Sequence, residues 1–156
     1  EAMIRWVGPA SKVMAMTRVT VPQRKDDNGT WHTITIPDHV DILCQLANGA
    51  QAHIRISAVT GLSPGNEVWL YGTEGTIHLD QRQNVFAGRR GDSALAEIPN
   101  PSEYQYSWHV EEEFVASIRE GTPVTRTPFD VGLHYMEFTE AVTRSAQTGL
   151  AVSLPL

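Results

Sequence analysis

Six histidines and one cysteine are the residues of this sequence best suited to binding a metal ion. The histidines are spread along the chain: His32, His39, His53, His78, His109 and His134. No two of them have the i, i+4 spacing that places two imidazoles on one helix face. No second cysteine accompanies Cys44. Zinc sites combine several such ligands at short spacings, so we predict no metal site and expect His53 and His78 on an exposed sheet face.

The candidates for covalent or acid–base chemistry are Ser63, Cys44 and the glutamates at 111–113. Ser63 lies in Leu62–Gly65, which lacks the preceding strand and following helix of a nucleophile elbow. Cys44 falls on the apolar face of a predicted strand, which favours a buried, unreactive thiol. Consecutive glutamates in a helix do not face one another, so a solvated first turn is favoured over an acid–base pair. We therefore predict no catalytic residue in this chain.

No glycine-rich loop of the kind that binds a nucleotide phosphate is present in the sequence. Such a loop carries G-x-G-x-x-G or G-x-x-x-x-G-K-[ST] between a strand and a helix. Gly72-Thr73-Glu74-Gly75 has too few glycines, and it joins two predicted strands. We predict that this chain binds no cofactor.

The elements that would hold these side chains begin with a series of strands. Alternating apolar and polar residues predict strands over 12–21, 30–36, 40–47, 50–57, 67–71 and 76–80, with shorter ones at 84–87 and 94–98. Short turns join successive strands, so the sheet should be largely antiparallel.

The register of the hairpin around Asn48-Gly49 follows from its side chains. A two-residue loop would place Ile42 opposite Arg55 and mix apolar with polar residues on each face. A three-residue loop, 47–49, pairs Ile42 with Ile54 and separates the two kinds of residue. A slip of one residue moves every side chain to the other face, so the separated register is predicted, with Gly49 in the left-handed conformation.

Helices follow the strands. Apolar residues recur every four positions from Val110, which predicts a helix over 107–119 that ends at Gly121. Asp130 is predicted to cap a second helix that reaches Gln147. Its expected core residues are Val131, Tyr135, Phe138 and Val142. Gly149 should end this helix before a last strand at 150–154. This order, with strands first and helices afterwards, indicates an α+β fold with a large, mostly antiparallel open-faced sheet and helices packed on one face.

The outer face of the sheet should carry residues that are unusual for a solvated surface. In the second predicted hairpin, pairing Tyr71 with Thr76 places Trp69 and His78 on this face. The full set is Leu43, His53, Arg55, Trp69, Tyr71 and His78. Aromatic residues and arginine are enriched at interfaces, so contact with another chain is favoured over cover by a loop or helix of the same chain. We expect a homo-oligomer formed through this face.

Length and composition exclude several classes of protein. The 156 residues are enough for one domain with a core. The net charge of −6 and the lack of a long basic run argue against a nucleic-acid partner. No apolar stretch reaches the roughly 20 residues that would cross a bilayer, so no membrane partner is expected. A single cysteine excludes an internal disulfide and fits a reducing compartment, so a cytoplasmic location is expected.

The first residues have the spacing of the end of an amphipathic helix. Met3, Trp6 and Val7 would share one side of it, yet a helix this short does not form alone. A fragment of a longer protein is therefore favoured over a trimmed native terminus.

Five segments, in this order, resemble motifs of the Gfo/Idh/MocA family, which includes glucose–fructose oxidoreductase and inositol dehydrogenase. They are Arg5–Pro9 with the strand that follows, the hairpin Leu46–Ala50, the strand–turn–strand Leu70–Ile77, the helix Phe114–Gly121 with the pattern F-x-x-x-I-R-x-G, and Ser145–Gly149. Each motif is modest by itself. Their order across nearly the whole chain carries the resemblance.

The resemblance implies that residues 1–156 are a single GAPDH-like carboxyl-terminal domain. The parent protein would have an amino-terminal Rossmann domain that binds NAD or NADP, and would oxidise or reduce a small-molecule substrate such as a sugar or polyol. The family's catalytic lysine, and the Asp and His residues of the helix leading into this domain, have no counterpart here, so the fragment should be inactive. The alternative is a non-catalytic binding or assembly module that associates through its sheet face.

The same resemblance points to candidate substrate contacts. In relatives, the loop before the strand at Glu67 often contributes to the substrate pocket, and here that loop is 60–66. Ser63 and Asn66 are candidates to hydrogen-bond a sugar-like hydroxyl. Tyr106 and His109, before or early in the first long helix, are further candidates. Turn or cap chemistry is an equal alternative for each of these residues.

Overall fold

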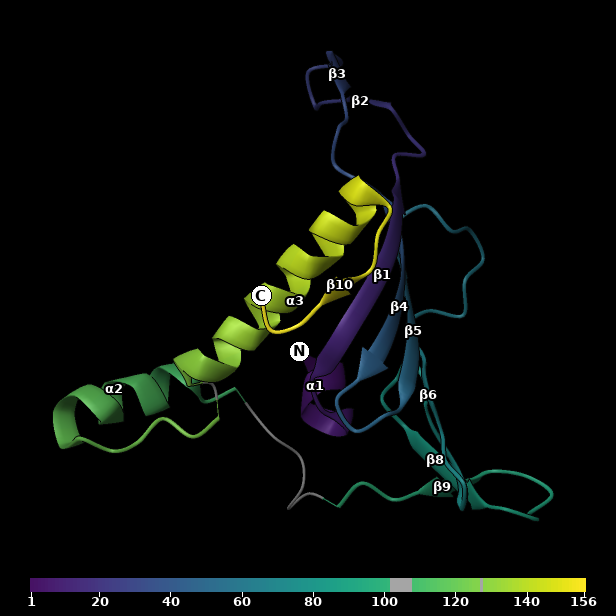
Figure 1. The fold of residues 1–156 in the computed structure, drawn as a ribbon, viewed down its shortest axis with the longest axis vertical. Helices are drawn as coiled ribbons and strands as arrows, with labels where there is room; N and C mark the ends of the chain where they lie inside the picture. Colours follow the sequence, from purple (N-terminus) through teal and green to yellow (C-terminus); the bar gives the residue numbers. More distant parts are fainter. Residues whose placement is uncertain (102–107, 127) are drawn as a thin grey trace. The chain divides into compact units, whose positions relative to one another are not determined.

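The computed structural model describes residues 1–101, 108–126 and 128–156, and they form two compact units. The first unit comprises Glu1–Thr60 and Val110–Leu156, and the second Gly61–His109. The first contains α1 (Ala2–Val7), β1 (Ala10–Arg18), β2 (Gln23–Lys25), β3 (Trp31–Thr33), β4 (His39–Leu46), β5 (Gln51–Ser57), α2 (Val110–Glu120), α3 (Phe129–Thr148) and β10 (Val152–Ser153) (Figure 1). The second contains β6 (Val68–Tyr71), β7 (Gly75–Leu79), β8 (Val85–Arg89) and β9 (Ala96–Ile98).

The main sheet of the first unit has the strand order β10-β1-β4-β5, and its pairings are antiparallel. The predicted register of the β4–β5 hairpin is confirmed, because Ile42 lies opposite Ile54 and Asp41 lies opposite Arg55. The predicted conformation of Gly49 is also confirmed, with a φ of 87°. Sorting of apolar and polar faces was therefore enough to fix this pairing.

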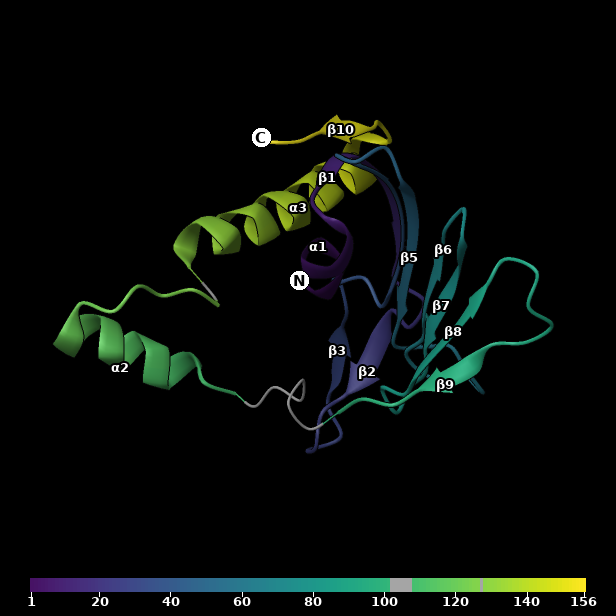
Figure 2. The same ribbon diagram turned by 90° about the horizontal axis from the view of Figure 1, so that it is seen from below.

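The core lies on one face of this sheet. Its buried apolar residues are Ala10, Val13, Ala15, Ile42, Cys44, Leu46 and, from α3, Ala141. Met3 and Val7 of α1 pack against the same cluster. Figure 2 shows α1 and α3 on the same side of the sheet. The predicted arrangement of a sheet with helices on one face is thus confirmed.

Ser145 is the buried polar residue at the contact between α3 and β1. Its hydroxyl accepts a hydrogen bond from the Ala15 backbone N–H at 2.9 Å and donates one to the Leu150 carbonyl at 2.7 Å. β10 pairs with Lys12 and Val13 but does not extend to Ala15. The serine therefore satisfies a backbone donor that β10 leaves unpaired, as burial of a polar group requires.

α3 differs from its prediction at the start and agrees with it at the end. Asp130 was predicted as the cap, but Pro128 occupies that position, without a side-chain cap hydrogen bond, and Asp130 lies in the first turn. An acidic residue there still faces favourably polarised N–H groups. The left-handed Gly149 ends the helix as predicted.

The second unit is a four-stranded antiparallel sheet with the order β6-β7-β8-β9. Tyr71 pairs with Thr76 and Leu70 with Ile77, as predicted. Gly75 lies directly against the backbone of β8, and a β-carbon at this position would collide with the Gly88 carbonyl oxygen. A glycine is therefore required at position 75, because β7 lies so close to β8 there.

The segment between β1 and β4 forms a separate hairpin, β2–β3, in place of the longer strand predicted at 30–36. The Asp26 carboxylate accepts hydrogen bonds from the N–H groups of Asn28 and Thr30 and so organises the turn. The ammonium group of Lys25 lies 5.0 Å from the centre of the Trp31 ring. These local contacts explain why β3 pairs with β2, the strand that precedes it in the sequence.

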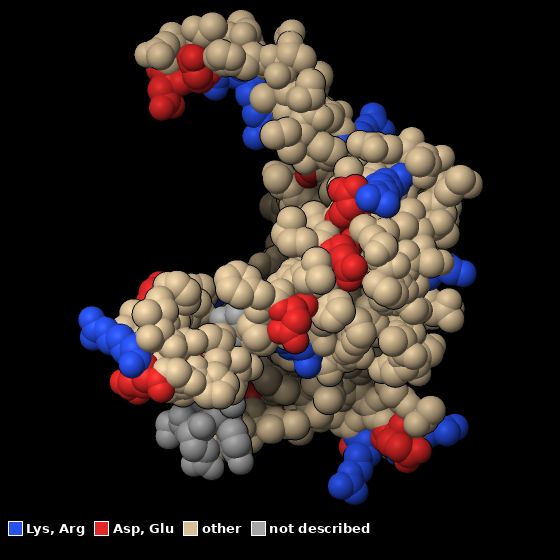
Figure 3. Space-filling view, turned by 60° about the vertical axis from the view of Figure 1, so that its left-hand side comes forward, with Lys and Arg blue, Asp and Glu red and all other residues tan. Residues whose placement is uncertain are grey.

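Charged residues are dispersed over the described surface that Figure 3 shows, where acidic and basic side chains lie among uncharged ones. No helix of the described residues is long and apolar enough to span a membrane.

Candidate functional site

The open face of the first sheet lies opposite α3 and carries three of the six predicted interface residues. Leu43 and His53 are cross-strand partners on β4 and β5, and Arg55 follows on β5. All three side chains are exposed. Met14 and Met16 of β1 are also exposed, and Met14 lies opposite Leu43. The face therefore combines an apolar strip with charged side chains.

Asp41 organises the charged part of this face. Its Oδ1 accepts a hydrogen bond from Arg55 Nε at 3.2 Å and lies 3.2 Å from His53 Nε2. Its Oδ2 lies 2.8 Å from His39 Nε2. The sequence predicted Asp41 opposite Arg55, but it gave no sign that His39 would join them, because His39 and Asp41 are two residues apart on one strand. The carboxylate thus holds three cationic or potentially cationic groups.

The hydrogen bonds to Asp41 stabilise its ionised form. The bond with His39, then those with Arg55 and His53, lower the pKa of Asp41 from 3.8 to about 2. A depressed pKa stabilises the folded state above the ordinary value, and that stabilisation is lost as the pH falls toward 2.

We expect a carbon-13 NMR titration of the Asp41 carboxyl group to show a midpoint near pH 2. In Arg55→Gln the midpoint should rise, because one cationic donor is lost. The matched control is Arg24→Gln, since Arg24 is exposed on β2 and pairs with Asp38 instead. An Asp41 midpoint at its ordinary value in the unaltered protein would contradict the described cluster.

The other three predicted interface residues lie in the second unit. Trp69 stacks on His78, with ring centroids 3.8 Å apart, and Tyr71 continues the stack at 6.0 Å from Trp69. Phe86 of β8 lies 5.8 Å from His78 on its other side. The expectation that His78 is exposed was wrong, because its side chain is only 14% exposed between these rings.

Glu67 joins this aromatic stack and was not anticipated from the sequence. Its Oε2 accepts a hydrogen bond from Trp69 Nε1 at 3.3 Å. His78 Nε2 lies 3.7 Å from the same oxygen, beyond hydrogen-bond distance, and is buried without a hydrogen-bond partner among the described residues. The six predicted residues therefore form two groups of three on different sheets.

The loop before β6 contains two of the predicted substrate contacts. Ser63 Oγ accepts a hydrogen bond from the Gly65 N–H at 3.3 Å, which is turn chemistry. Gly65 has a φ of 95° and lies against the side chain of Gln81. Asn66 is exposed. Ser63 therefore shapes the loop, and Asn66 presents its amide to solvent.

The two remaining candidates are Tyr106 and His109. Tyr106 falls outside the described residues. His109 immediately precedes α2 and is partly buried.

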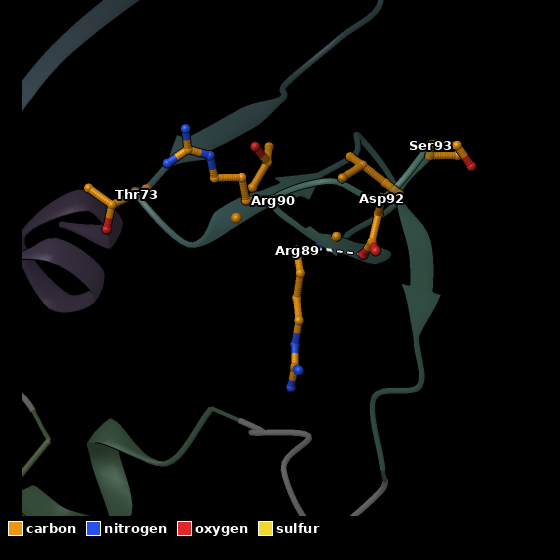
Figure 4. A pocket seen from close by; sticks show the side chains of 11 residues that line it. Thr73, Arg89, Arg90, Asp92 and Ser93 are labelled. Carbon is orange, nitrogen blue, oxygen red and sulfur yellow. Dashed lines mark hydrogen bonds between the residues drawn. The ribbon is translucent and has the colours of Figure 1, made fainter.

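A cavity of about 520 Å³ lies in the second unit, between the Gly72–Gly75 turn and residues 88–95. The Asp92 carboxylate accepts a hydrogen bond from the Arg89 N–H at 2.7 Å. Figure 4 shows the side chains of Arg89 and Arg90 pointing away from each other, so they do not converge on one anion. None of the predicted site residues that the structure describes lines this cavity.

Cys44 and the described acidic residues and histidines were also candidates for chemistry. Burial raises the pKa of the Cys44 thiol to about 11, as expected for an unreactive core cysteine. Across residues 1–101, 108–126 and 128–156, no three histidine, cysteine, aspartate or glutamate side chains are grouped so as to hold a metal ion.

The fold is that of an α+β domain whose antiparallel sheet is covered by helices on one face. Residues 2–78 match a family described as GFO/IDH/MocA C-terminal domain. The match covers just under half of the chain, and it is to the family that the order of the five motifs indicated.

Solved structures share the fold over nearly the whole chain. An NAD-binding oxidoreductase from Klebsiella pneumoniae matches 96% of this chain with a TM-score of 0.78 and 19% identity. Levoglucosan dehydrogenase in complex with NADH and L-sorbose matches 98%, with a TM-score of 0.74 and 20% identity. The WlbA dehydrogenase from Bordetella pertussis, in complex with NADH and UDP-GlcNAcA, matches 99%, with a TM-score of 0.67 and 20% identity.

The chain spans less than half of each of these structures, namely 46%, 47% and 42% of their lengths. A comparison with curated protein sequences found no match.

Proposed function

We propose that this chain is the substrate-side and assembly domain of an NAD(P)-dependent oxidoreductase that acts on a sugar, polyol or similar hydroxyl or carbonyl substrate. The observation that carries the proposal is the family match at residues 2–78. The fold supports it, because the similar structures include dehydrogenases solved with NADH. The unpaired Cys44 is consistent with a cytoplasmic protein.

In this proposal the cofactor carries the redox chemistry and an amino-terminal Rossmann domain binds it. This chain would contribute the loop before β6, where Asn66 faces solvent and Ser63 fixes the turn. Tyr106 and His109 remain candidate contacts with the substrate. The isolated chain would have neither a cofactor site nor catalytic residues, and would be inactive.

We expect the full-length protein to bind NADH or NADPH in titration calorimetry and the 156-residue chain to bind neither. In the full-length enzyme, Asn66→Ala should raise KM several-fold with little change in kcat, because it removes a substrate hydrogen bond made throughout the reaction. Asn28→Ala, in the β2–β3 turn, is the matched control. Micromolar NADH binding by the 156-residue chain would contradict the proposal.

The open face of the first sheet and the Trp69 stack are proposed to form contacts between copies of the protein. On the first sheet, the exposed side chains of Met14, Met16 and Leu43 lie beside the charged cluster around Asp41. An exposed apolar patch with polar residues at its border is typical of a protein interface. The competing function, a non-catalytic assembly module, would use the same faces. The two proposed functions predict different sequences before Glu1, since the oxidoreductase requires a dinucleotide-binding domain there and the assembly module does not.

We expect light scattering to show an oligomer that Leu43→Glu and Trp69→Ala each shift toward monomer. In Leu43→Glu a charge would be desolvated at the contact. Ile36→Glu is the matched control, because Ile36 is an exposed aliphatic residue in the same unit but lies outside these faces. A monomer for the unaltered full-length protein would remove the assembly role.

A further inference from the structure

The sequence contains two Asn-Gly pairs, Asn28-Gly29 and Asn48-Gly49. Asparagine is a thermolabile residue, because the backbone nitrogen of the next residue can attack the carbon of its side-chain amide. A glycine in the next position favours this attack, since it has no β-carbon to hinder the approach and its backbone adopts many conformations. Each pair is therefore a potential site of deamidation, and the surrounding structure decides whether the reaction proceeds.

The two pairs lie in turns with the same backbone geometry. Gly29 has a φ of 81° and Gly49 a φ of 87°. The Gly29 N–H donates to the Asp26 carbonyl at 3.0 Å, and the Gly49 N–H donates to the Leu46 carbonyl at 3.0 Å. Both asparagines are exposed. The glycine conformation and the exposure therefore do not distinguish the two sites.

The side-chain amide of Asn48 is held by the rest of the fold. Its Nδ2 donates to the Val7 carbonyl at 3.0 Å, and its Oδ1 accepts a hydrogen bond from the Ala50 N–H at 3.0 Å. The amide must leave both partners before its carbon can turn toward the Gly49 nitrogen. Two side-chain hydrogen bonds thus oppose the reaction at this position.

The side-chain amide of Asn28 has no such restraint. Within residues 1–101, 108–126 and 128–156, no hydrogen bond is made by the Asn28 side chain, whose residue is bonded through its backbone N–H. The turn is organised by Asp26 instead, since its Oδ1 accepts from the N–H groups of Asn28 and Thr30. The Asn28 amide is therefore free to rotate toward Gly29.

The β2–β3 hairpin that carries Asn28 also has less support than the β4–β5 hairpin that carries Asn48. β2 and β3 have three residues each, all of them exposed, and they form a sheet by themselves. Isolated two-stranded hairpins are marginally stable in water. β4, by contrast, contributes Ile42, Cys44 and Leu46 to the core. The Gly29 N–H must leave the Asp26 carbonyl before its nitrogen can attack, so easier local opening favours the reaction at Asn28.

We propose that Asn28 is a site of spontaneous deamidation and that the fold protects Asn48 from the same reaction. The Gly29 nitrogen, after losing its proton to solvent, forms a bond with Cγ of Asn28. The bond from Cγ to Nδ2 breaks, and the amino group takes a proton from solvent and leaves as ammonia. Water then opens the resulting succinimide. Cleavage between the Gly29 nitrogen and Cγ gives aspartate, and cleavage between that nitrogen and the main-chain carbonyl carbon gives isoaspartate.

Either product would change the β2–β3 turn, and isoaspartate would change it more. Both products add a negative charge beside Asp26 and Asp27. Isoaspartate also lengthens the main chain by a methylene group, which moves the Thr30 N–H away from the Asp26 carboxylate that holds it. Pairing of β2 with β3, and with it the contact of Lys25 with Trp31, would then be weakened.

Peptide mapping by mass spectrometry, after incubation of the folded protein in mildly alkaline buffer, tests this proposal. Asn28 should convert on the order of 10–100-fold faster than Asn48, because two side-chain hydrogen bonds must open first at Asn48. In urea that unfolds the protein, the two rates should become similar, since both sites are then unrestrained Asn-Gly pairs. A rate at Asn28 no greater than that at Asn48 in the folded protein would overturn the proposal, and so would a difference that persisted undiminished in urea.

Asn28→Gln is the matched control for the chemistry. Glutamine keeps the amide but would have to close a larger ring, so the mass shift in this peptide should disappear while the rate at Asn48 stays the same. A mass shift that persisted in Asn28→Gln would place the reaction at another residue and overturn the assignment.

Hydrogen exchange tests the consequence for the hairpin. Asn28→Asp supplies the charge without the longer main chain, and the isoaspartate form can be separated by chromatography. Amides of β2 and β3 should exchange faster in the isoaspartate form than in Asn28→Asp, whereas amides of β4 should not differ. Equal exchange of the hairpin amides in the two forms would overturn the proposed effect on the turn.

Discussion

Replacing Ile42 by alanine should lower the free energy of unfolding by about 2–5 kcal/mol. Ile42 lies in the middle of β4 and is 3% exposed. Its cross-strand partners are Ala15 of β1 and Ile54 of β5, so the sheet backbone surrounds it on both sides. Strands joined by hydrogen bonds cannot move inward to fill the space that the lost methyl and methylene groups would leave. The variant therefore loses both buried apolar surface and packing contacts.

Ile56→Ala is the matched control for this measurement. Ile56 lies on the adjacent strand and is 61% exposed, so its replacement should change the free energy by no more than about 0.5 kcal/mol. Both variants would be compared by urea denaturation followed by circular dichroism. Similar losses in the two variants would contradict the described position of Ile42 in the core.

Ser145→Ala should lower the free energy of unfolding by about 1–3 kcal/mol, because it leaves a buried N–H and a carbonyl without partners. The N–H belongs to Ala15 and the carbonyl to Leu150. Alanine is a good helix former, so a loss cannot be assigned to helix propensity. The Ala15 amide should also exchange with solvent faster, which NMR would detect.

Thr143→Ala provides the comparison within the same helix. The Thr143 hydroxyl bonds to the Thr139 carbonyl of its own helix and is exposed, so its loss should cost little. If Ser145→Ala were as stable as the unaltered protein, the proposed role of the hydroxyl between α3 and β1 would be wrong.

The hairpins were predictable because their information is local. In β4 and β5, one register alone separates apolar from polar residues, and the structure adopts it. Gly49 and Gly149 were equally predictable, since each ends an element where the chain needs a positive φ. Such features depend on residues within a few positions of one another.

The core of α3 shows where a sequence pattern is insufficient. Large apolar residues such as Val131 and Tyr135 were expected at the centre of the core, but they are only partly buried. The deepest positions are Ala141 and Ser145, because small side chains let the helix approach the sheet closely. The need for a hydroxyl at 145 comes from an unpaired donor 130 residues away in the chain, which no local pattern reveals.

The candidate site was predicted in part for the same reason. Pairing of strands placed Leu43 beside His53 and Trp69 beside His78, as the structure shows. The contributions of His39 and Glu67 were missed, because each depends on side-chain conformation within a strand and not on register. The six residues are divided between two sheets because β5 is the last strand of the first sheet and β6 belongs to the second. No residue pattern in the sequence marks this division.

The two sides of the first sheet are protected from pairing with another polypeptide in different ways. On one side, β10 pairs with β1 at Lys12 and Val13, and the Ser145 hydroxyl occupies the Ala15 N–H beyond it. On the other side, no strand of the described residues pairs with the outer side of β5, but β5 carries Arg55, and a charged residue on an outer strand discourages intermolecular strand pairing. A chain that ended at Gly149 would lose β10 but keep Ser145 and Arg55, so aggregation by strand addition would begin at Lys12 and Val13 of β1.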